Sequence, residues 1–174
     1  MLNKFTQNNA QENILYNNIL LLSRNKLFYT KFDLADTFQN RINLIFLHIS
    51  FLFIKIKQNN GDKKYNHFYQ KMFDLIFKKI ELNMREIGNG DTTINKNMKF
   101  LVKIFYNILL NCEKYAEKSL NDKFFFFQKY LKCNRIEITP NNSALIKYFD
   151  KYHSFCLDLC SDSVLKGELI FNYK

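Results

Sequence analysis

Three residues near the C-terminal end, His153, Cys156 and Cys160, are of the types that bind a transition metal. Within one helix, spacings of three and seven would place their side chains on one side, where three soft ligands could converge on zinc. A closed zinc site needs a fourth ligand, and the sequence has no Cys-x-x-Cys pair to complete one. We therefore interpret these residues as core cysteines beside one histidine, and we predict no metal and no other cofactor.

A glycine-rich step at Gly88-Asn89-Gly90 is the second place where chemistry is conceivable, because such loops can cradle phosphate. A phosphate-binding loop follows a strand and is followed by Lys-Ser or Lys-Thr, whereas Asp91 comes next here and would repel phosphate. The Gly-x-Ser-x-Gly and His-Glu-x-x-His patterns are also absent. We therefore predict no catalytic residues and a protein that is not an enzyme.

Residues 81–98 predict a helix, a tight loop and a second helix. Gly88 can adopt the left-handed conformation that ends a helix, and Asn89-Gly90 is a turn dipeptide. Asp91 can cap the amides of the next helix, where its charge complements the positive helix end. Two long periodic segments therefore meet at this corner, and the core stripe expected for the first is Tyr65, Tyr69, Met72, Ile76, Ile80 and Met84.

The segment from Asp36 to about Gln58 predicts the central helix of the fold. Asp36 is the expected N-cap, and Gln39, three residues later, can complete a capping box. Apolar residues cover nearly every side of the segment, which is typical of a buried helix. Its apolar run, residues 44–54, is interrupted and far shorter than the roughly 20 residues that a membrane span needs. We therefore predict a buried helix and no membrane span.

Arg41, His48 and Lys55 follow one another at intervals of seven along this helix. That spacing places them on one side. They are either the polar seam of the helix or, in a functional interpretation, Arg41 and His48 support an internal polar network or line a client groove.

The remaining pattern predicts one all-α domain, a bundle of about six or seven helices around the central helix. We expect a disordered N-terminus at residues 1–10 and a helical domain at 11–174. One proline and four glycines in 174 residues favour long helices over a sandwich or barrel. The expected helices cover about 12–24, 26–29, 36–58, 64–87, 92–118, 120–132 and 139–159, the last with a cap and first turn at Thr139-Pro140, and a short closing segment follows at 164–171.

Four consecutive phenylalanines, residues 124–127, are difficult to bury within one helix. Burial against neighbouring helices is one outcome. The other is an exposed aromatic surface formed by Phe125, Phe126 and Tyr130, which would mark a binding site.

The formal net charge of +10 and the pI near 9.4 would ordinarily indicate an anionic partner. The strong use of Asn, Lys, Ile, Phe and Tyr is also what an AT-rich genome produces, so we give the charge little weight. The four cysteines come without a signal peptide or a disulfide framework, which indicates a reducing compartment. We expect a bacterial cytoplasm or, alternatively, the mitochondrial matrix.

Two motifs resemble those of the ubiquinol-cytochrome c chaperone family. Residues 83–91, Asn-Met-Arg-Glu-Ile-Gly-Asn-Gly-Asp, followed by Ile94, Lys96 and Met98, are similar to its Leu-Arg-Glu-Met-Gly-x-Gly-Asp signature. Residues 36–41, Asp-Thr-Phe-Gln-Asn-Arg, followed by Leu-His at 47–48, are similar to its Asp-Thr-Phe-x-Gly-Arg and Leu-His marker. The two motifs stand in the family's order. The family's Phe-Tyr-Gly-Arg step, in contrast, is Phe-Tyr-Asn-Ile at 105–108.

The resemblance implies an assembly chaperone for the cytochrome bc1 complex, which binds newly made cytochrome b as a peripheral protein of the inner membrane. It also implies a ribosome and a small helical protein as partners, and no specific DNA binding. The alternative is a basic ribosome- or RNA-binding helical module without a cytochrome b client. We expect Arg41, His48, Arg85, Glu86 and Asp91 to form one cluster or line one face. The binding residues implied by the motifs are Asp36, Thr37, Arg41, His48, Arg85, Glu86, Gly88, Gly90, Asp91 and Lys96.

Overall fold

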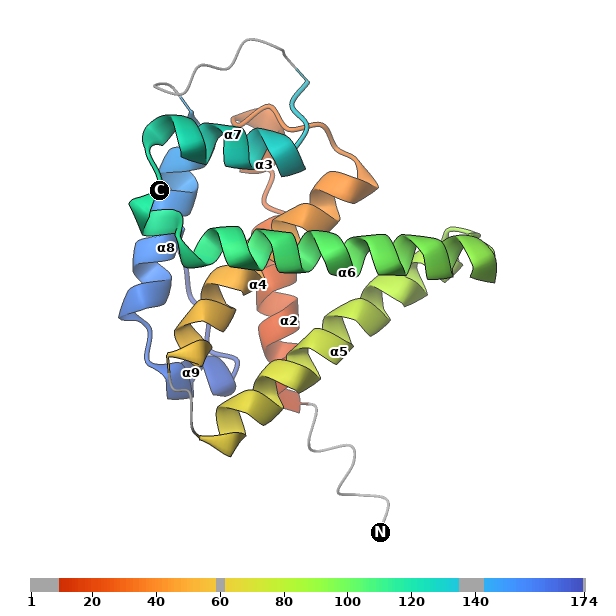
Figure 1. Cartoon of the computed structure of the whole chain (residues 1–174), viewed down its shortest axis with the longest axis horizontal. Coiled ribbons are helices and arrows are strands. Elements are labelled where there is room, and N and C mark those ends of the chain that lie inside the picture. The colour runs from red at the N-terminus through yellow and green to blue at the C-terminus, as the bar shows by residue number, and fades with distance from the viewer. Residues whose placement is uncertain (1–9, 59–61, 135–142, 174) are drawn as a thin grey trace.

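The structure is a computed structural model that describes residues 10–58, 62–134 and 143–173. Apart from one isolated bridge, between Leu34 and Cys133, the regular elements of these residues are helices, which confirms the all-α prediction. In chain order (Figure 1) they are α2 (Ala10–Ser23), α3 (Leu27–Thr30), α4 (Phe38–Lys57), α5 (Lys63–Glu86), α6 (Asp91–Glu113), the 3-10 turn η1 (Tyr115–Glu117), α7 (Leu120–Tyr130), α8 (Ala144–Asp158) and α9 (Ser161–Leu165). The disordered N-terminus was expected at residues 1–10; residues 1–9 lie outside the described residues, and Ala10 begins α2. The expected helix start at Thr139-Pro140 also lies outside the described residues.

Helix α4 is the centre of the molecule, as predicted. Every side chain from residue 42 to residue 53 is buried. The helix contacts α2, α5, α6, α8 and α9, so its apolar surface is covered by neighbours on all sides. Within the described part of the chain, no helix has the length and hydropathy that crossing a membrane requires.

Helices α5 and α6 are two long amphipathic rods that meet at one end and diverge toward the other (Figure 1). The buried stripe of α5 runs through Met72, Ile76, Ile80 and Met84, at the spacing of four that the sequence predicts. Helix α6 lies against α4 with its own buried stripe and leaves its opposite side in solvent. These two helices carry one of the two motif regions at their junction.

Helices α7 and α8 close the remaining side of α4. Ser119 caps α7 and Ser143 caps α8, each accepting a hydrogen bond from the backbone N–H three residues later. Rings from α3, α4 and α8 then pack edge to face, with the Phe28 and Tyr148 centroids 4.9 Å apart. This aromatic core surrounds the middle of α4, where His48 lies.

Candidate functional site

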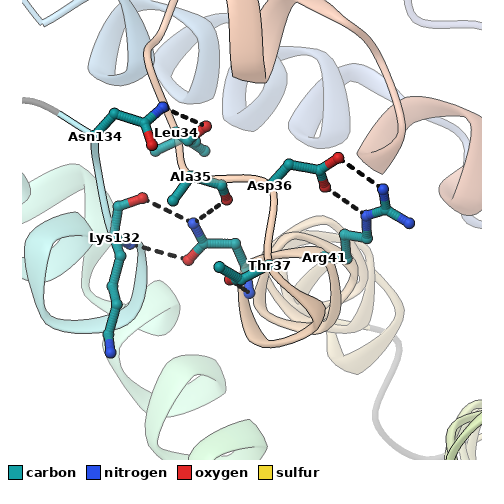
Figure 2. Close-up of polar contacts among 8 residues, drawn as sticks. Leu34, Ala35, Asp36, Thr37, Arg41, Lys132 and Asn134 are labelled. Carbon is teal, nitrogen blue, oxygen red and sulfur yellow. Dashed lines mark hydrogen bonds and ion pairs between the residues drawn. The ribbon is translucent and has the colours of Figure 1, made fainter. Parts of the chain in front are cut away.

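The first motif region is the start of α4. Thr37, and not Asp36, is the N-cap: its side chain accepts a hydrogen bond from the Asn40 N–H at 3.2 Å. The predicted Asp36 cap is therefore wrong, because the Asp36 carboxylate accepts two hydrogen bonds from Arg41 instead, at 2.7 and 2.8 Å (Figure 2). The Arg41 guanidinium holds the pKa of that carboxyl below its ordinary value. About half of each of these two side chains is exposed, so this bidentate pair faces solvent.

Asn40, which stands at the glycine position of the motif, joins this corner to the end of α7. Its side chain is fully buried and donates from Nδ2 to the carbonyls of Ala35 and Lys132, at 2.7 and 2.8 Å. Its Oδ1 accepts from the Lys132 N–H at 2.9 Å. An amide is suited to this position because it can donate twice and accept at the same time.

The segments on either side of Asn40 are also paired through their backbones. The Ala35 N–H donates to Lys132 O and the Asn134 N–H to Asp33 O, both at 2.9 Å. The Asn134 side chain adds a hydrogen bond to Leu34 O (Figure 2). Residues 33–35 and 132–134 therefore run side by side, and Asn40 fixes them to the first turn of α4.

His48 lies in the interior of the protein, further along the same helix. Its Nδ1 is 2.6 Å from Leu44 O, and its Nε2 is 2.8 Å from the Tyr148 hydroxyl. A carbonyl oxygen only accepts, so Nδ1 carries the proton and Nε2 accepts from Tyr148. Tyr152 closes the network by donating to His48 O at 3.2 Å. The internal polar network expected for Arg41 and His48 is present for His48 and links α4 to α8. Arg41 is not part of it, because its side chain is half exposed and pairs with Asp36.

Burial controls the charge of this network. His48 is fully buried, and the loss of hydration lowers its pKa from 6.5 to about 4, although the hydrogen bond to Leu44 opposes the shift. Burial also raises the pKa of Tyr148. Both side chains are therefore uncharged near neutral pH, and His48 acts as a structural hydrogen-bonding group rather than a charged contact for a client.

The second motif region is the junction of α5 and α6. Arg85 donates from Nε and Nη2 to one oxygen of Glu81, at 3.1 and 2.8 Å, and from Nη1 to Asp91. Asp91 is the first residue of α6, and Gly90 is the N-cap, so the predicted capping role of the Asp91 side chain is wrong. The carboxylate instead ties the new helix to the end of α5 through Arg85.

The loop between these helices is closed by Gly88, as predicted. Its φ of +89° lies in the left-handed region, and the N–H groups of Gly88 and Asn89 donate to the carbonyls of Arg85 and Met84. The Asn89 side chain donates to Met84 O as well. The loop thus satisfies the last carbonyls of α5 before α6 begins.

The motif residues have three different sets of partners. Arg41 pairs with Asp36, His48 with Tyr148, and Arg85 with Glu81 and Asp91. The other predicted residues of the second region, Gly88, Gly90, Glu86 at the end of α5 and Lys96 on the outer side of α6, are exposed.

The predicted aromatic surface on α7 is reduced to one side chain. Phe125 is 64% exposed, whereas Phe126 and Tyr130 are buried at 5% and 8%. Phe126 packs against the rings of Phe127 and Tyr130, and its remaining edge lines a hollow of about 410 Å³ between α6 and α7. Three of the four adjacent phenylalanines, Phe124, Phe126 and Phe127, are therefore buried in the core.

The three residues of metal-binding type, His153 and Cys156 on α8 and Cys160 after it, are not arranged as one site. Cys156 is buried, Cys160 is exposed beyond the end of the helix, and half-buried His153 packs between the rings of Phe51 and Tyr115. No group of three His, Cys, Asp or Glu side chains is arranged to hold a metal within the ranges that the structure describes.

The network residues that the sequence analysis missed are Asn40 and Tyr148. Asn40 bonds to Lys132, 92 residues away in the chain, and Tyr148 bonds to His48, 100 residues away. A signal existed for Asn40, because an amide within an apolar helix must find buried partners. Nothing in the sequence distinguishes Tyr148 from the other tyrosines.

Comparison with known proteins gives two matches. Residues 30–123 match a family model described as "Ubiquinol-cytochrome C chaperone". The whole chain is similar to the crystal structure of the Cbp3 homolog from Brucella abortus, with a TM-score of 0.76 and 21% identity, over 99% of this chain and 97% of that one. At this identity the likeness establishes the fold alone. No curated protein gives a significant match. The family match runs from the end of α3 to the first turn of α7 and includes both motif regions.

Proposed function

This chain belongs to the ubiquinol-cytochrome C chaperone family, and from that premise we propose that it is an assembly chaperone for the cytochrome bc1 complex. Its client, in this proposal, is newly made cytochrome b, bound at the inner membrane. The observation that carries the proposal is the family match over residues 30–123, because that range contains both motif regions and the central helix that supports them.

We assign client binding to the junction of α5 and α6. Leu82 is 43% exposed and Ile87 is 64% exposed, on either side of Arg85. An arginine beside exposed apolar side chains has the composition of the centre of a protein-protein contact. Ion pairs that face solvent, as Arg85 with Glu81 and Asp91 do, contribute little to folding. This supports a role for the junction in binding.

Two further partners follow from the same premise. A chaperone for a membrane subunit that is still being made would work near the ribosome and as a peripheral protein of the inner membrane, on its cytoplasmic or matrix side. A small helical partner protein would need an apolar surface of its own, and Phe125 beside the hollow between α6 and α7 is a candidate.

The first test is genetic. Deletion of the gene is expected to remove assembled bc1 complex and haem-loaded cytochrome b while other respiratory complexes remain. Blue-native gels and haem spectra measure both. Respiration through an intact bc1 complex in the deleted strain would refute the proposed function.

The second test addresses the junction. A photo-crosslinking amino acid at Ile87 is expected to capture cytochrome b in cells, whereas the same amino acid at Leu21, which is 72% exposed on α2, is not. Replacing Leu82 with Ser is expected to lower the amount of bc1 complex, and replacing the equally exposed Leu157 with Ser is not. Equal capture at both crosslinker positions would contradict the assignment.

The net charge of +10 favours one rival, a ribosome- or RNA-binding module without a cytochrome b client. That function predicts a salt-sensitive affinity for generic RNA and no capture of cytochrome b. Measuring RNA binding over a salt series beside the crosslinking experiment separates the two functions.

A further inference from the structure

The outward side of α6 carries lysines and large apolar side chains together. Lys96, Phe100, Lys103, Leu110 and the C-cap residue Lys114 follow one another at spacings of three, four and seven, so they lie along one side of the helix, opposite its buried stripe. Phe100 is 58% exposed and Leu110 is 59% exposed. In Figure 1 this helix crosses the front of the molecule along its whole length. We call these five residues, together with the exposed Lys99 beside Phe100, the α6 face.

The α6 face is long and ends at the hollow between α6 and α7, which Lys114 lines together with Phe125 of α7. At a rise of about 1.5 Å per residue, the α6 face alone is about 27 Å long. This is an extended surface rather than a single exposed side chain.

The charge of this face is positive over its first part, before the hollow where Glu117 and Asp122 lie beside Lys114. Between Thr92 and Cys112 the sequence contains three lysines, at 96, 99 and 103, and no acidic residue. Four lysines elsewhere in the described chain are in ion pairs: Lys57, Lys64, Lys71 and Lys123. Lys96, Lys99 and Lys103, in contrast, are in no ion pair among the residues that the structure describes.

We propose that the α6 face binds the surface of an anionic lipid bilayer. Lysine ammonium groups attract anionic headgroups, and phenylalanine or leucine side chains between them can enter the boundary of the acyl chains. The outward side of a single helix is a ridge, which fits a surface whose lipids can rearrange, whereas a helical partner needs a groove. The inference rests on the proposed function only in that the protein acts beside a membrane.

The test uses the full chain and vesicles of phosphatidylcholine with or without phosphatidylglycerol, measured by co-sedimentation. The wild type is expected to bind only the vesicles that contain phosphatidylglycerol, and less as salt rises. The triple variant Lys96→Gln, Lys99→Gln and Lys103→Gln is expected to weaken binding by about fivefold for each lysine. Phe100→Ser is expected to weaken it several-fold. These side chains are exposed, so the fold is expected to survive, and circular dichroism checks this.

The matched control is the triple variant Lys26→Gln, Lys63→Gln and Lys78→Gln. It removes the same charge from exposed positions outside the α6 face. An equal loss of vesicle binding in both triple variants would show attraction by net charge alone and would overturn the inference. So would the absence of binding to either kind of vesicle.

Two other occupants are outcomes of the same experiment, and both overturn the inference. A single-stranded RNA that binds in preference to vesicles, and that the α6 triple variant no longer binds, would assign the face to nucleic acid. A dimer in solution that Phe100→Ser dissociates would assign it to a second copy of the chain. Vesicle binding is measured without cytochrome b, so it tests this inference separately from the proposed function. A protein that does not bind vesicles can still support bc1 assembly in cells, and a protein that binds vesicles can fail to support it.

Discussion

His48 makes the stability of the fold depend on pH in a way that can be calculated. The buried side chain has a pKa of about 4, against 6.5 when it is exposed. The folded state therefore binds fewer protons than the unfolded state between these values. Its contribution to stability is complete above pH 6.5 and is lost as the pH falls toward 4. At about pH 5 the loss amounts to about 2 kcal/mol of the free energy of unfolding.

The perturbation that isolates this effect is the double variant His48→Phe and Tyr148→Phe. Replacing His48 alone would leave the buried Tyr148 hydroxyl without its acceptor, at a cost of about 1 to 3 kcal/mol. Removing both partners leaves two apolar rings in an aromatic environment and is expected to be nearly neutral at pH 7. The double variant then has no titrating group at this position.

The assay is urea unfolding of both proteins at a series of pH values from about 7.5 to 4.5, followed by circular dichroism. The wild type is expected to lose about 2 kcal/mol more than the double variant between about pH 7 and pH 5. Other groups, such as half-buried His153, titrate in both proteins and cancel in the difference. If the free energy of unfolding changed equally with pH in the two proteins, the conclusion that His48 is buried and neutral would be wrong.

Three further changes test the two motif regions and the C-terminal contact by the same urea unfolding. Gly88→Ala places a side chain at φ +89° and is expected to cost about 1 to 2 kcal/mol, whereas Gly90→Ala, equally free of close neighbours, should stay within about 0.5 kcal/mol of wild type; equal effects would contradict the left-handed loop. Asn40→Ala removes three buried hydrogen bonds and should cost about 2 to 4 kcal/mol, and a loss below about 1 kcal/mol would show that this amide does not join the two segments. Gly167→Ala combines φ +81° with a Cβ only 2.9 Å from Ile14 and is expected to cost about 2 to 4 kcal/mol; a neutral result would place the C-terminal segment elsewhere.

Periodicity predicted the long helices well because it reports which side of a helix is buried. The central position of α4 followed from apolar residues on every side, and the α5 stripe from Met72 to Met84 followed from spacing. Helix α2 is less regular: Leu15 and Ile19 are buried, whereas the apolar residues Ile14 and Leu21 are 49% and 72% exposed. Its buried side includes Glu12 instead, which a pattern of apolar residues does not reveal.

The polar contacts were harder to predict, because several residues compete for each role. Asp36 and Thr37 are both good caps, and Arg41 decided between them by pairing with Asp36. Likewise, the Asp91 carboxylate could have capped α6, but it accepts a hydrogen bond from Arg85 instead. Local rules give the candidates in such cases, and only the three-dimensional arrangement selects the partner.

The central position of α4 also has a consequence for how the chain is made. Ribosomes release the chain from its N-terminal end, so α4 is complete well before α6, α8 and α9, which cover it. During that interval a 20-residue helix that is apolar on almost every side has only part of its cover, the condition under which partly folded chains aggregate. In the proposed function this chain shelters an unfinished membrane subunit, and it passes through the same exposed stage during its own synthesis.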